Sequence, residues 1–469
     1  MQSKLLSVLA LSALGVSAGC QPKPHWPEPE RHAALAAGLD EPIAIRVVGS
    51  PVDEAEPDPS AITPAEAIRL ALTSHPEIQA AIARVRMSQA EAHQERLLPN
   101  PVLDVALRFA ETGGTPVVEA GLSAELLSLL QKPGRVRAAD HRLRVAATEA
   151  VTVALDVLAQ VQECYAGIQT LDSLIPVLEE RRGLTGRLLT IADSRLKAGE
   201  GTRLDVTTLR AQEAELSIEL ISLEQERREL RLQLARLIGH PTSKADWELS
   251  RWAVPVPQTL DESAWIAAAL EHRPEIQTRL AELSALGVEA RLARWILTEG
   301  AEAGVESERD DHVWSVGPSI SVPLPVFDWG QARRELADAR RIEAAHQLVQ
   351  LKRQAVEDVR RALAGYQSSS EAARRVREEL LPLVEQRGRE AEAIYRAGQD
   401  DILMVILAQQ ELRAGQIKLL ELERRAAEAF IRLQRAVGGP AHLPAASPIG
   451  TSSNNQTTST PAPTTQPLP

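Results

Sequence analysis

The fold of this chain is decided by residues 313–324, which read VWSVGPSISVPL. Large apolar side chains at Trp314, Val316 and Ile320 alternate with small or polar residues. This alternation predicts a β-strand with one apolar and one polar face, because successive side chains of a strand point to opposite sides. A strand of about 10 residues is also long enough to cross a bilayer at a tilt. The stretch is therefore a candidate membrane strand.

Three further segments show the same alternation, at 102–109, at 117–126 and, more weakly, at 297–307. Gly113 and Gly114 separate the first two segments and favour a turn between them. Aromatic residues near the strand ends suit the headgroup level of a bilayer, and ordinary core packing is the alternative. These residues are Trp295, Trp314, Phe327 and Trp329.

The chain also contains an internal duplication with a period of about 200 residues. The sequence HPEIQ at 75–79 recurs 198 residues later as RPEIQ at 273–277. Four other landmarks repeat at nearly the same offset: Gly134 and Gly330, Tyr165 and Tyr366, Ala198-Gly199 and Ala397-Gly398, and Gly239 and Gly438. The chain is therefore expected to fold as two similar units.

Each copy reads as a helix, two strands, a very long helix, a break and a final helix. The predicted helices lie at 63–98, 133–197 and 202–238 in the first copy, and at 261–295, 331–397 and 401–437 in the second. A helix of about 65 residues spans on the order of 95 Å, which two helices of about 35 residues placed end to end roughly match. Each copy is thus expected to form a two-column pillar with strands at one end.

The resulting division of the chain has six parts. They are a signal peptide at 1–19, an extended leader at 20–60, a first repeat at 61–241, a linker at 242–260, a second repeat at 261–439 and a disordered Ser/Thr/Pro-rich tail at 440–469. The expected fold class is mainly α with a small β part.

The N-terminus has the features of a secretory signal, with Lys4 before a short apolar run at 5–16. Cys20 follows small residues and resembles the acylated cysteine of a bacterial lipobox, although Ser17 stands where such sequences usually carry Leu. This resemblance implies a lipidated Cys20, and Gln21 after it implies sorting to the outer membrane. Ordinary signal cleavage nearby is the alternative.

Composition excludes several classes of function. The net charge is −12 and no sustained basic stripe occurs, which argues against nucleic-acid binding. Two cysteines cannot build a disulfide framework, and Cys164 is expected in a helical core. No histidine pair has metal-ligand spacing, and neither a phosphate loop nor a nucleophile elbow is present. We therefore expect no enzyme, no metal site and no cofactor.

The number of strands determines the assembly that we expect. An open sheet cannot persist in lipid, because each unpaired backbone group costs several kcal/mol there, and known spanning barrels begin at eight strands. Four strands must therefore combine with copies of the chain, giving eight in a dimer or twelve in a trimer. An eight-stranded barrel is filled by its own side chains, whereas a larger one leaves a conduit. Polar residues such as Ser315 and Ser319 would face that conduit.

Over residues 62–439 the chain resembles the TolC-type outer-membrane efflux channels. The resemblance rests on the duplicated Pro-Glu-Ile helices, on Pro99-Asn100-Pro101 before the first strand, on the paired Ala-Gly tips and on the lipoprotein-like start. It implies a homotrimer with a twelve-stranded barrel in outer-membrane lipid above an α-helical periplasmic tunnel. It also implies that a periplasmic adaptor and an inner-membrane transporter open the tunnel for efflux.

The resemblance locates a gate at the two helical tips. Gly199 and Gly398 mark the tips, Asp205 falls where the family often has an acidic residue, and Tyr395 matches a tyrosine that ties adjacent tips shut. A Tyr395–Asp205 hydrogen bond in the closed state is one hypothesis. The other is that Asp205 only caps or solvates the start of its helix.

The narrowest point departs from the family. Some members carry aspartates at the positions of Met404 and Leu407, whereas this chain has Asp400 and Asp401 at the turn. Either the ring of carboxylates that these aspartates form in the family has moved toward the mouth of the tunnel, or it is absent. In the second case the apolar side chains of Met404 and Leu407 would close the tunnel by excluding water.

Two other functions are compatible with parts of the pattern. The same duct could serve type I secretion of proteins. A periplasmic adaptor or a coiled-coil lipoprotein without a pore would share the helices, but an adaptor has one helical hairpin flanked by β domains. The sequence does not identify the cargo.

Overall fold

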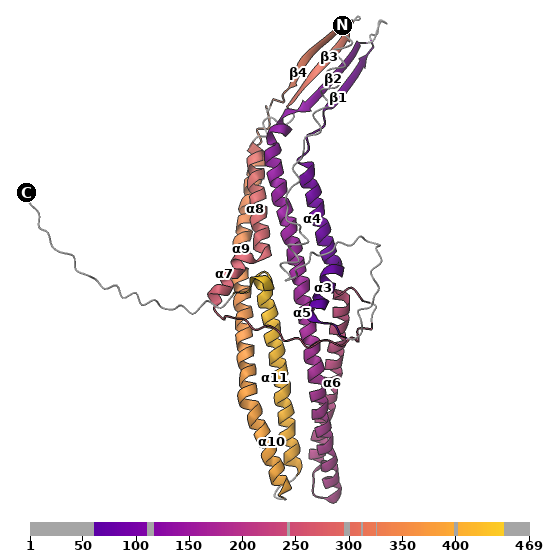
Figure 1. Cartoon of the computed structure of the whole chain (residues 1–469), viewed down its shortest axis with the longest axis vertical. Coiled ribbons are helices and arrows are strands. Elements are labelled where there is room, and N and C mark those ends of the chain that lie inside the picture. The colour runs from indigo at the N-terminus through magenta and orange to yellow at the C-terminus, as the bar shows by residue number, and fades with distance from the viewer. Residues whose placement is uncertain are drawn as a thin grey trace, which may run out of the picture.

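The computed structural model describes residues 61–109, 117–241, 244–294, 301–310, 313–324, 326–397 and 402–444. The molecule is elongated, with long helices along its body and a small sheet at one end (Figure 1). The predicted fold class is therefore confirmed: a mainly helical chain with a small β part and a duplicated unit.

The two repeats contain the same order of elements. The first comprises α3 (Pro64–Ser74), α4 (Pro76–Gln94), β1 (Val102–Arg108), β2 (Val117–Glu125), α5 (Leu126–Ala198) and α6 (Arg203–Leu237). The second comprises α7 (Glu262–His272), α8 (Pro274–Leu292), β3 (Glu302–Asp310), β4 (Val313–Ser321), α9 (Gln331–Arg375), a π-helical turn at Val376–Leu380, α10 (Leu381–Arg396) and α11 (Ile402–Ala436).

The first helix of each repeat is divided, although the sequence pattern predicted one continuous helix. The division lies at His75 and at Arg273, whose ψ angles of 124° and 120° are extended. A proline follows each of them, and proline disfavours helical geometry in the residue before it. The repeated Pro-Glu-Ile motif therefore starts a new helix in each copy.

The long helices also differ from the prediction. Helix α5 begins at Leu126 and passes through Pro133, where the pattern suggested a start. In the second repeat a π-helical turn interrupts the predicted helix just before Pro382. Proline has no N–H and its ring crowds the carbonyl four residues earlier, so a local widening of the helix relieves the conflict.

The two glycines that the sequence comparison paired have different roles. Gly134 lies inside α5, where an added Cβ would come within 2.5 Å of Leu292 on α8. Gly330 instead precedes α9 with a left-handed φ of 71°. Close helix packing explains the first glycine and backbone conformation explains the second.

The four strands form one antiparallel sheet in the order β1-β2-β3-β4. Strands β2 and β3 join the two repeats, with Ala120 opposite Ser307. Because the order follows the sequence, β1 and β4 form the two edges of the sheet.

The helices lie in a row rather than in a closed bundle. Helix α5 contacts α4 and α6 on one side and α8 and α11 on the other, and α9 contacts α8 and α11. Helix α4 stands above α6 and α8 above α11, so each pair of short helices accompanies one long helix (Figure 1). Helices α4 and α6 thus form one edge of the row, and α9 and α10 form the other.

Candidate functional site

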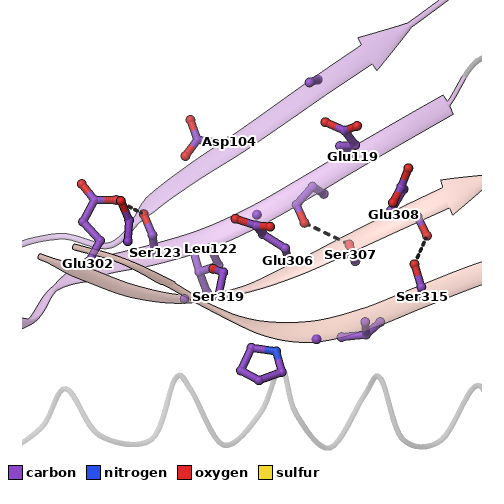
Figure 2. Close-up of a pocket in the computed structure, with 18 of the residues that line it drawn as sticks. Asp104, Glu119, Leu122, Ser123, Glu302, Glu306, Ser307, Glu308, Ser315 and Ser319 are labelled. Carbon is purple, nitrogen blue, oxygen red and sulfur yellow. Dashed lines mark hydrogen bonds between the residues drawn. The ribbon is translucent and has the colours of Figure 1, made fainter. Parts of the chain in front are cut away.

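One face of the sheet is a polar groove (Figure 2). Among the described residues that line it, Arg108 is the one basic side chain, and it pairs with Glu119 at 2.9 Å. Glu119 lies directly opposite Glu308 in the strand register. The other acidic and hydroxyl residues of the groove are Asp104, Ser123, Glu302, Glu306, Ser307, Ser315, Ser319 and Ser321. This face needs contact with water, because carboxylates are costly to desolvate.

The opposite face of the sheet is apolar and uncovered. Leu103 is 68% exposed, Val316 is 68% exposed and Ile320 is 74% exposed. Exposed apolar surface costs about 25 cal/mol per Å² in water, so a face of this kind needs an apolar cover. A hydrocarbon layer provides such a cover.

Aromatic side chains lie at both ends of the sheet. Phe109 and Trp314 are exposed near the hairpin ends, and the Arg309 guanidinium lies 5.8 Å from the centre of the Trp314 ring. Phe327 and Trp329 are exposed where the sheet leads into α9. The predicted Trp295 lies outside the described residues. Rings at the two ends of an apolar band are typical of membrane interfaces.

The first helical tip lies between α5 and α6. Gly199 ends α5 with a left-handed φ of 79°, and an added Cβ would meet no atom within 4 Å. Thr202 caps α6, and the carboxylate of Asp205 accepts hydrogen bonds from the Thr202 hydroxyl at 2.7 Å and from its N–H at 3.2 Å. The Thr202 hydroxyl thereby lowers the pKa of Asp205. The capping role of Asp205 is thus present in the chain.

The second tip lies between α10 and α11, beside the first (Figure 1). Met404 and Leu407 remain about two-fifths exposed, whereas Ile406 between them packs on Leu184 and Leu188 of α5. Gly398, Asp400 and Asp401 lie outside the described residues. The predicted apolar pair therefore faces away from the core.

The two partners of the hypothetical latch lie on different tips. Tyr395 is 44% exposed near the end of α10. Within the described part of the chain, no hydrogen bond joins Tyr395 to Asp205. Any such bond would have to form in another state or between subunits.

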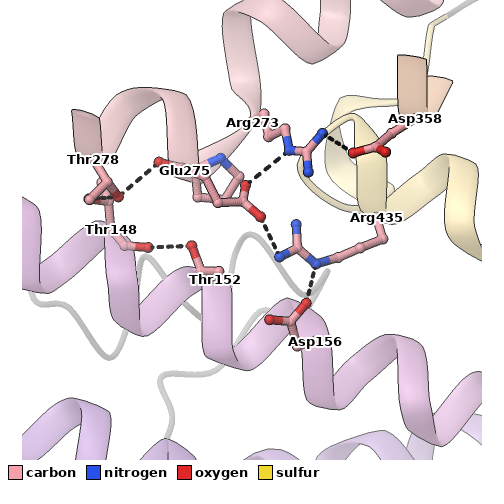
Figure 3. Close-up of polar contacts among 9 residues, drawn as sticks. Thr148, Thr152, Asp156, Arg273, Glu275, Thr278, Asp358 and Arg435 are labelled. Atoms are coloured by element: carbon pink, nitrogen blue, oxygen red, sulfur yellow. Dashed lines mark hydrogen bonds and ion pairs between the residues drawn. The ribbon is translucent and has the colours of Figure 1, made fainter. Parts of the chain in front are cut away.

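Sequence reasoning missed an ionic network that joins the two repeats (Figure 3). Arg435 of α11 donates to Asp156 of α5 and to Glu275 of α8, each at 2.6 Å. Arg273 donates to Asp358 of α9 at 2.8 Å and to Glu275 at 3.3 Å. Four helices meet there. The one available signal was an arginine at equivalent positions of both repeats, 236 and 435.

Two searches of the described residues bear on other functions. No group of three or more His, Cys, Asp or Glu side chains could hold a metal ion within the parts of the chain that the structure describes. One helical segment, Ser128–Ala198, is long and apolar enough to cross a membrane by length and composition. Its packing against α4, α6, α8 and α11 makes it the central helix of the row.

Comparison with known proteins agrees with this geometry. The Outer membrane efflux protein family matches residues 67–240 and 265–439, one match per repeat. The chain is 25% identical to the pyoverdine export outer membrane protein OpmQ of Pseudomonas aeruginosa, over 94% of this chain and 97% of that protein. It is 23% identical to the cobalt-zinc-cadmium resistance protein CzcC of Cupriavidus metallidurans, over 79% of this chain and 89% of that protein.

Solved structures show the same fold. The outer membrane protein VceC of Vibrio cholerae superposes with a TM-score of 0.66 at 20% identity, covering 80% of this chain and 96% of that one. The MtrE outer membrane channel of Neisseria gonorrhoeae superposes with a TM-score of 0.60 at 18% identity, covering 80% and 89%. With matches over both repeats and a sheet suited to lipid, the chain belongs to the outer membrane efflux protein family and is an efflux channel of the outer membrane.

Proposed function

We propose that three copies of this chain close into one channel, with a twelve-stranded barrel in the outer membrane and a helical tunnel in the periplasm. The observation that carries this proposal is the open sheet, whose edges β1 and β4 have no partner strand within the described chain. Unpaired edges are not tolerated in lipid, so each β4 must pair with the β1 of another copy. Three copies supply enough strands for an open conduit, whereas two do not.

The two faces of the sheet support the same arrangement. In a closed barrel the groove with Glu306 and Ser319 would line the conduit, and Leu103 and Ile320 would face lipid. The aromatic residues at the two ends would lie at the two headgroup layers. A closed barrel gives the polar face water and the apolar face lipid at the same time.

Within a tripartite efflux system, the channel would take its cargo from an inner-membrane transporter through a periplasmic adaptor. The named relatives export pyoverdine or confer resistance to metal ions. This favours small cargo over the proteins of type I secretion. A lipid chain on Cys20 would add a second attachment to the outer membrane.

The gate of the tunnel would be at the tips. Tyr395 of one tip would donate to Asp205 of the neighbouring tip in the closed state, at about 0.5–3 kcal/mol per bond. The glycine turn at Gly398 with Asp400 and Asp401 would form the mouth, and Met404 and Leu407 would narrow the tunnel behind it. An apolar constriction of this kind resists the passage of ions because it loses water easily.

Single-channel recording in planar lipid bilayers tests the function. The purified protein should show small conductance steps, and Asp205→Ala and Tyr395→Ala should each enlarge them. Thr202→Ala is the matched control, because it removes the helix cap but leaves the carboxylate of Asp205 in place. Equal enlargement in all three variants would attribute the effect to fraying of α6. A protein that never conducts would contradict the proposed channel.

A further inference from the structure

A groove lies between the first turns of α5 and the last turn of α8, close to the end of the sheet. Its walls include Leu130, Gly134 and Arg137 of α5 and Val288, Arg291 and Leu292 of α8. Its volume is about 360 Å³, which is within the range of about 300–1,000 Å³ found for small-ligand sites. Both helices belong to one chain, and α4 and α9 flank them on either side. The groove is therefore complete in a single subunit and lies away from the edges of the row.

The groove carries positive charge that no carboxylate of the described chain neutralises. Arg137 and Arg291 are exposed, and neither forms an ion pair with any described residue. The same holds for Arg294, one turn after Arg291. The nearest acidic residues of the two helices, Asp140 and Glu289, are each paired with another arginine. An anion in the groove would therefore meet arginines that have no other ionic partner among the described residues.

The Arg137 side chain extends along α5 toward the sheet. Its Nε donates to the carbonyl of Pro133 at 3.0 Å, one turn nearer the start of the helix. Side chains of a helix tilt toward its N-terminus, and the N-terminus of α5 directly follows β2. The two Nη groups of Arg137 make no hydrogen bond with any described residue. They can therefore bind two oxygens of one phosphate, which is the geometry that a guanidinium favours.

Apolar side chains are exposed between this arginine and the sheet. Leu130 is 70% exposed and Leu129 is 43% exposed. Leu130 lies four residues after the start of α5, or about 6 Å from the end of β2. The headgroup layer on each side of a bilayer is about 5–8 Å thick, so Leu130 would lie within this layer in the proposed barrel. Phe327 and Trp329 are exposed at the same end of the sheet. The groove thus has an apolar wall on the side of the hydrocarbon core.

The groove faces the outer side of the proposed channel. The linker packs on Gln169 of α5, whose side-chain N–H donates to the carbonyl of Ser250 at 2.7 Å. A segment on the inner side would obstruct the tunnel, so this contact marks the outer side. Arg137 lies 32 residues before Gln169, a separation that returns to within about 40° of the same side of an α-helix. Lipid can therefore reach Arg137 from outside the tunnel.

We propose that this groove binds the phosphate of an anionic phospholipid in the periplasmic leaflet of the outer membrane. Arg137 and Arg291 would bind the phosphate oxygens, and Leu130 would pack on the first carbons of an acyl chain. Basic pockets between helices at a membrane surface are typical sites for anionic headgroups. A zwitterionic headgroup suits the site less, because its ammonium group would meet the same arginines. The inference rests on the proposed barrel only for the level of the membrane, since the groove lies within one chain.

Native mass spectrometry of the full-length protein, stripped of lipid in detergent and titrated with phosphatidylglycerol, tests the inference. We expect one phosphatidylglycerol per chain to be retained in preference to phosphatidylethanolamine. Arg137→Gln with Arg291→Gln should weaken this retention about tenfold. That factor corresponds to about 1.4 kcal/mol, which is near the lower value for one hydrogen bond to a charged group. Arg182→Gln with Arg187→Gln is the matched control, because it removes the same charge from exposed residues of α5 at least about 68 Å farther along the helix.

Two further measurements separate a lipid site from a simple anion site. Leu130→Gln should weaken the retention of phosphatidylglycerol with both arginines in place, and excess inorganic phosphate should not displace the lipid. Equal retention of phosphatidylethanolamine, equal loss in the control pair, or displacement by inorganic phosphate overturns the inference. Any of these results in a protein that still conducts leaves the proposed channel intact. A monomeric protein that does not conduct would overturn the proposed channel, whereas the lipid titration reports on the groove of each chain separately.

Discussion

The centres of the two repeats fill equivalent positions with different chemistry. In the first repeat, the Tyr165 hydroxyl donates to the carbonyls of Ile62 and Ser250 at 2.8 and 2.6 Å, and its ring meets Trp252 edge-on. The equivalent Tyr366 of the second repeat is half-buried, and its ring tilts on Phe430 at 5.9 Å. The linker after α6 therefore packs on the core of the first repeat through Ser250 and Trp252.

The second repeat adds an ion pair beside its apolar core. Arg273 and Asp358 form an ion pair at 2.8 Å, whereas the equivalent positions of the first repeat are His75 and the buried Val157. A buried ion pair adds little net stability over an apolar pair, but removing one member leaves a costly charge. The comparison shows that duplicated folds can keep their geometry while exchanging packing for specific charge pairing.

The largest expected effect comes from removing the central arginine of the ionic network. Arg435→Met leaves the carboxylates of Asp156 and Glu275 without their shared partner, and we expect the free energy of unfolding to fall by about 3 kcal/mol. Denaturant titration followed by circular dichroism measures the loss. A loss below about 1 kcal/mol would mean that the network behaves like an exposed ion pair.

The tyrosine pair should show the next largest difference. Tyr165→Phe removes the donor of the hydrogen bonds to the carbonyls of Ile62 and Ser250. This should lower the free energy of unfolding by about 2 kcal/mol. Tyr366→Phe is the matched control, because its hydroxyl makes no hydrogen bond with the described residues. Equal losses in the two variants would remove the distinction between the two centres.

At the tip, Gly199→Ala should lower the free energy of unfolding by about 1–2 kcal/mol, because the left-handed φ of 79° suits residues without Cβ. Gly183→Ala within the same helix is the control. It should stabilise by about 0.5–1 kcal/mol, since an added Cβ meets nothing within 4 Å there. Denaturant titration measures the free energy of unfolding of both variants, and equal values would contradict the assigned turn.

The smallest expected effect is a change in how the free energy of unfolding depends on pH in the acid range. Burial raises the pKa of Glu275, but Arg435 and Arg273 outweigh it, so the pKa lies below the ordinary value of 4.5. A lowered carboxyl pKa stabilises the folded state above pH 4.5, and that stability is lost as the pH falls through the folded-state value. Glu275→Gln should flatten the stability curve in this acid range. If the variant and the parent protein lose stability equally as the pH falls, other carboxylates control the acid dependence.

The sequence was sufficient for the elements whose signal is local. Alternation identified β1, β2 and β4, and the repeated Pro-Glu-Ile motif revealed the duplication. It ended β3 too early, at residue 307, whereas the strand runs over Glu302–Asp310, because its far end carries Glu308 and Arg309 instead of alternating apolar residues. Pairing with β2 extends that end of the strand, and no local pattern records this pairing. The predicted start at 297–300 lies outside the described residues.

Other features depend on residues far apart in the chain. The Arg435 network joins residues 156, 275 and 435, so neither spacing nor periodicity could reveal it. The roles of Gly134 and Gly330 became distinct only when the packing of α8 on α5 was known. The capping of α6 by Asp205 with Thr202 is local, and the sequence offered it as one of two hypotheses.

The central claim is that one chain supplies one third of a closed channel. The mass of the particle in detergent, measured by light scattering with the detergent contribution subtracted, tests this claim most directly. We predict a protein mass three times that of the single chain after removal of its signal peptide. A particle with the mass of one chain, whose open sheet edges remain unpaired, would contradict the account.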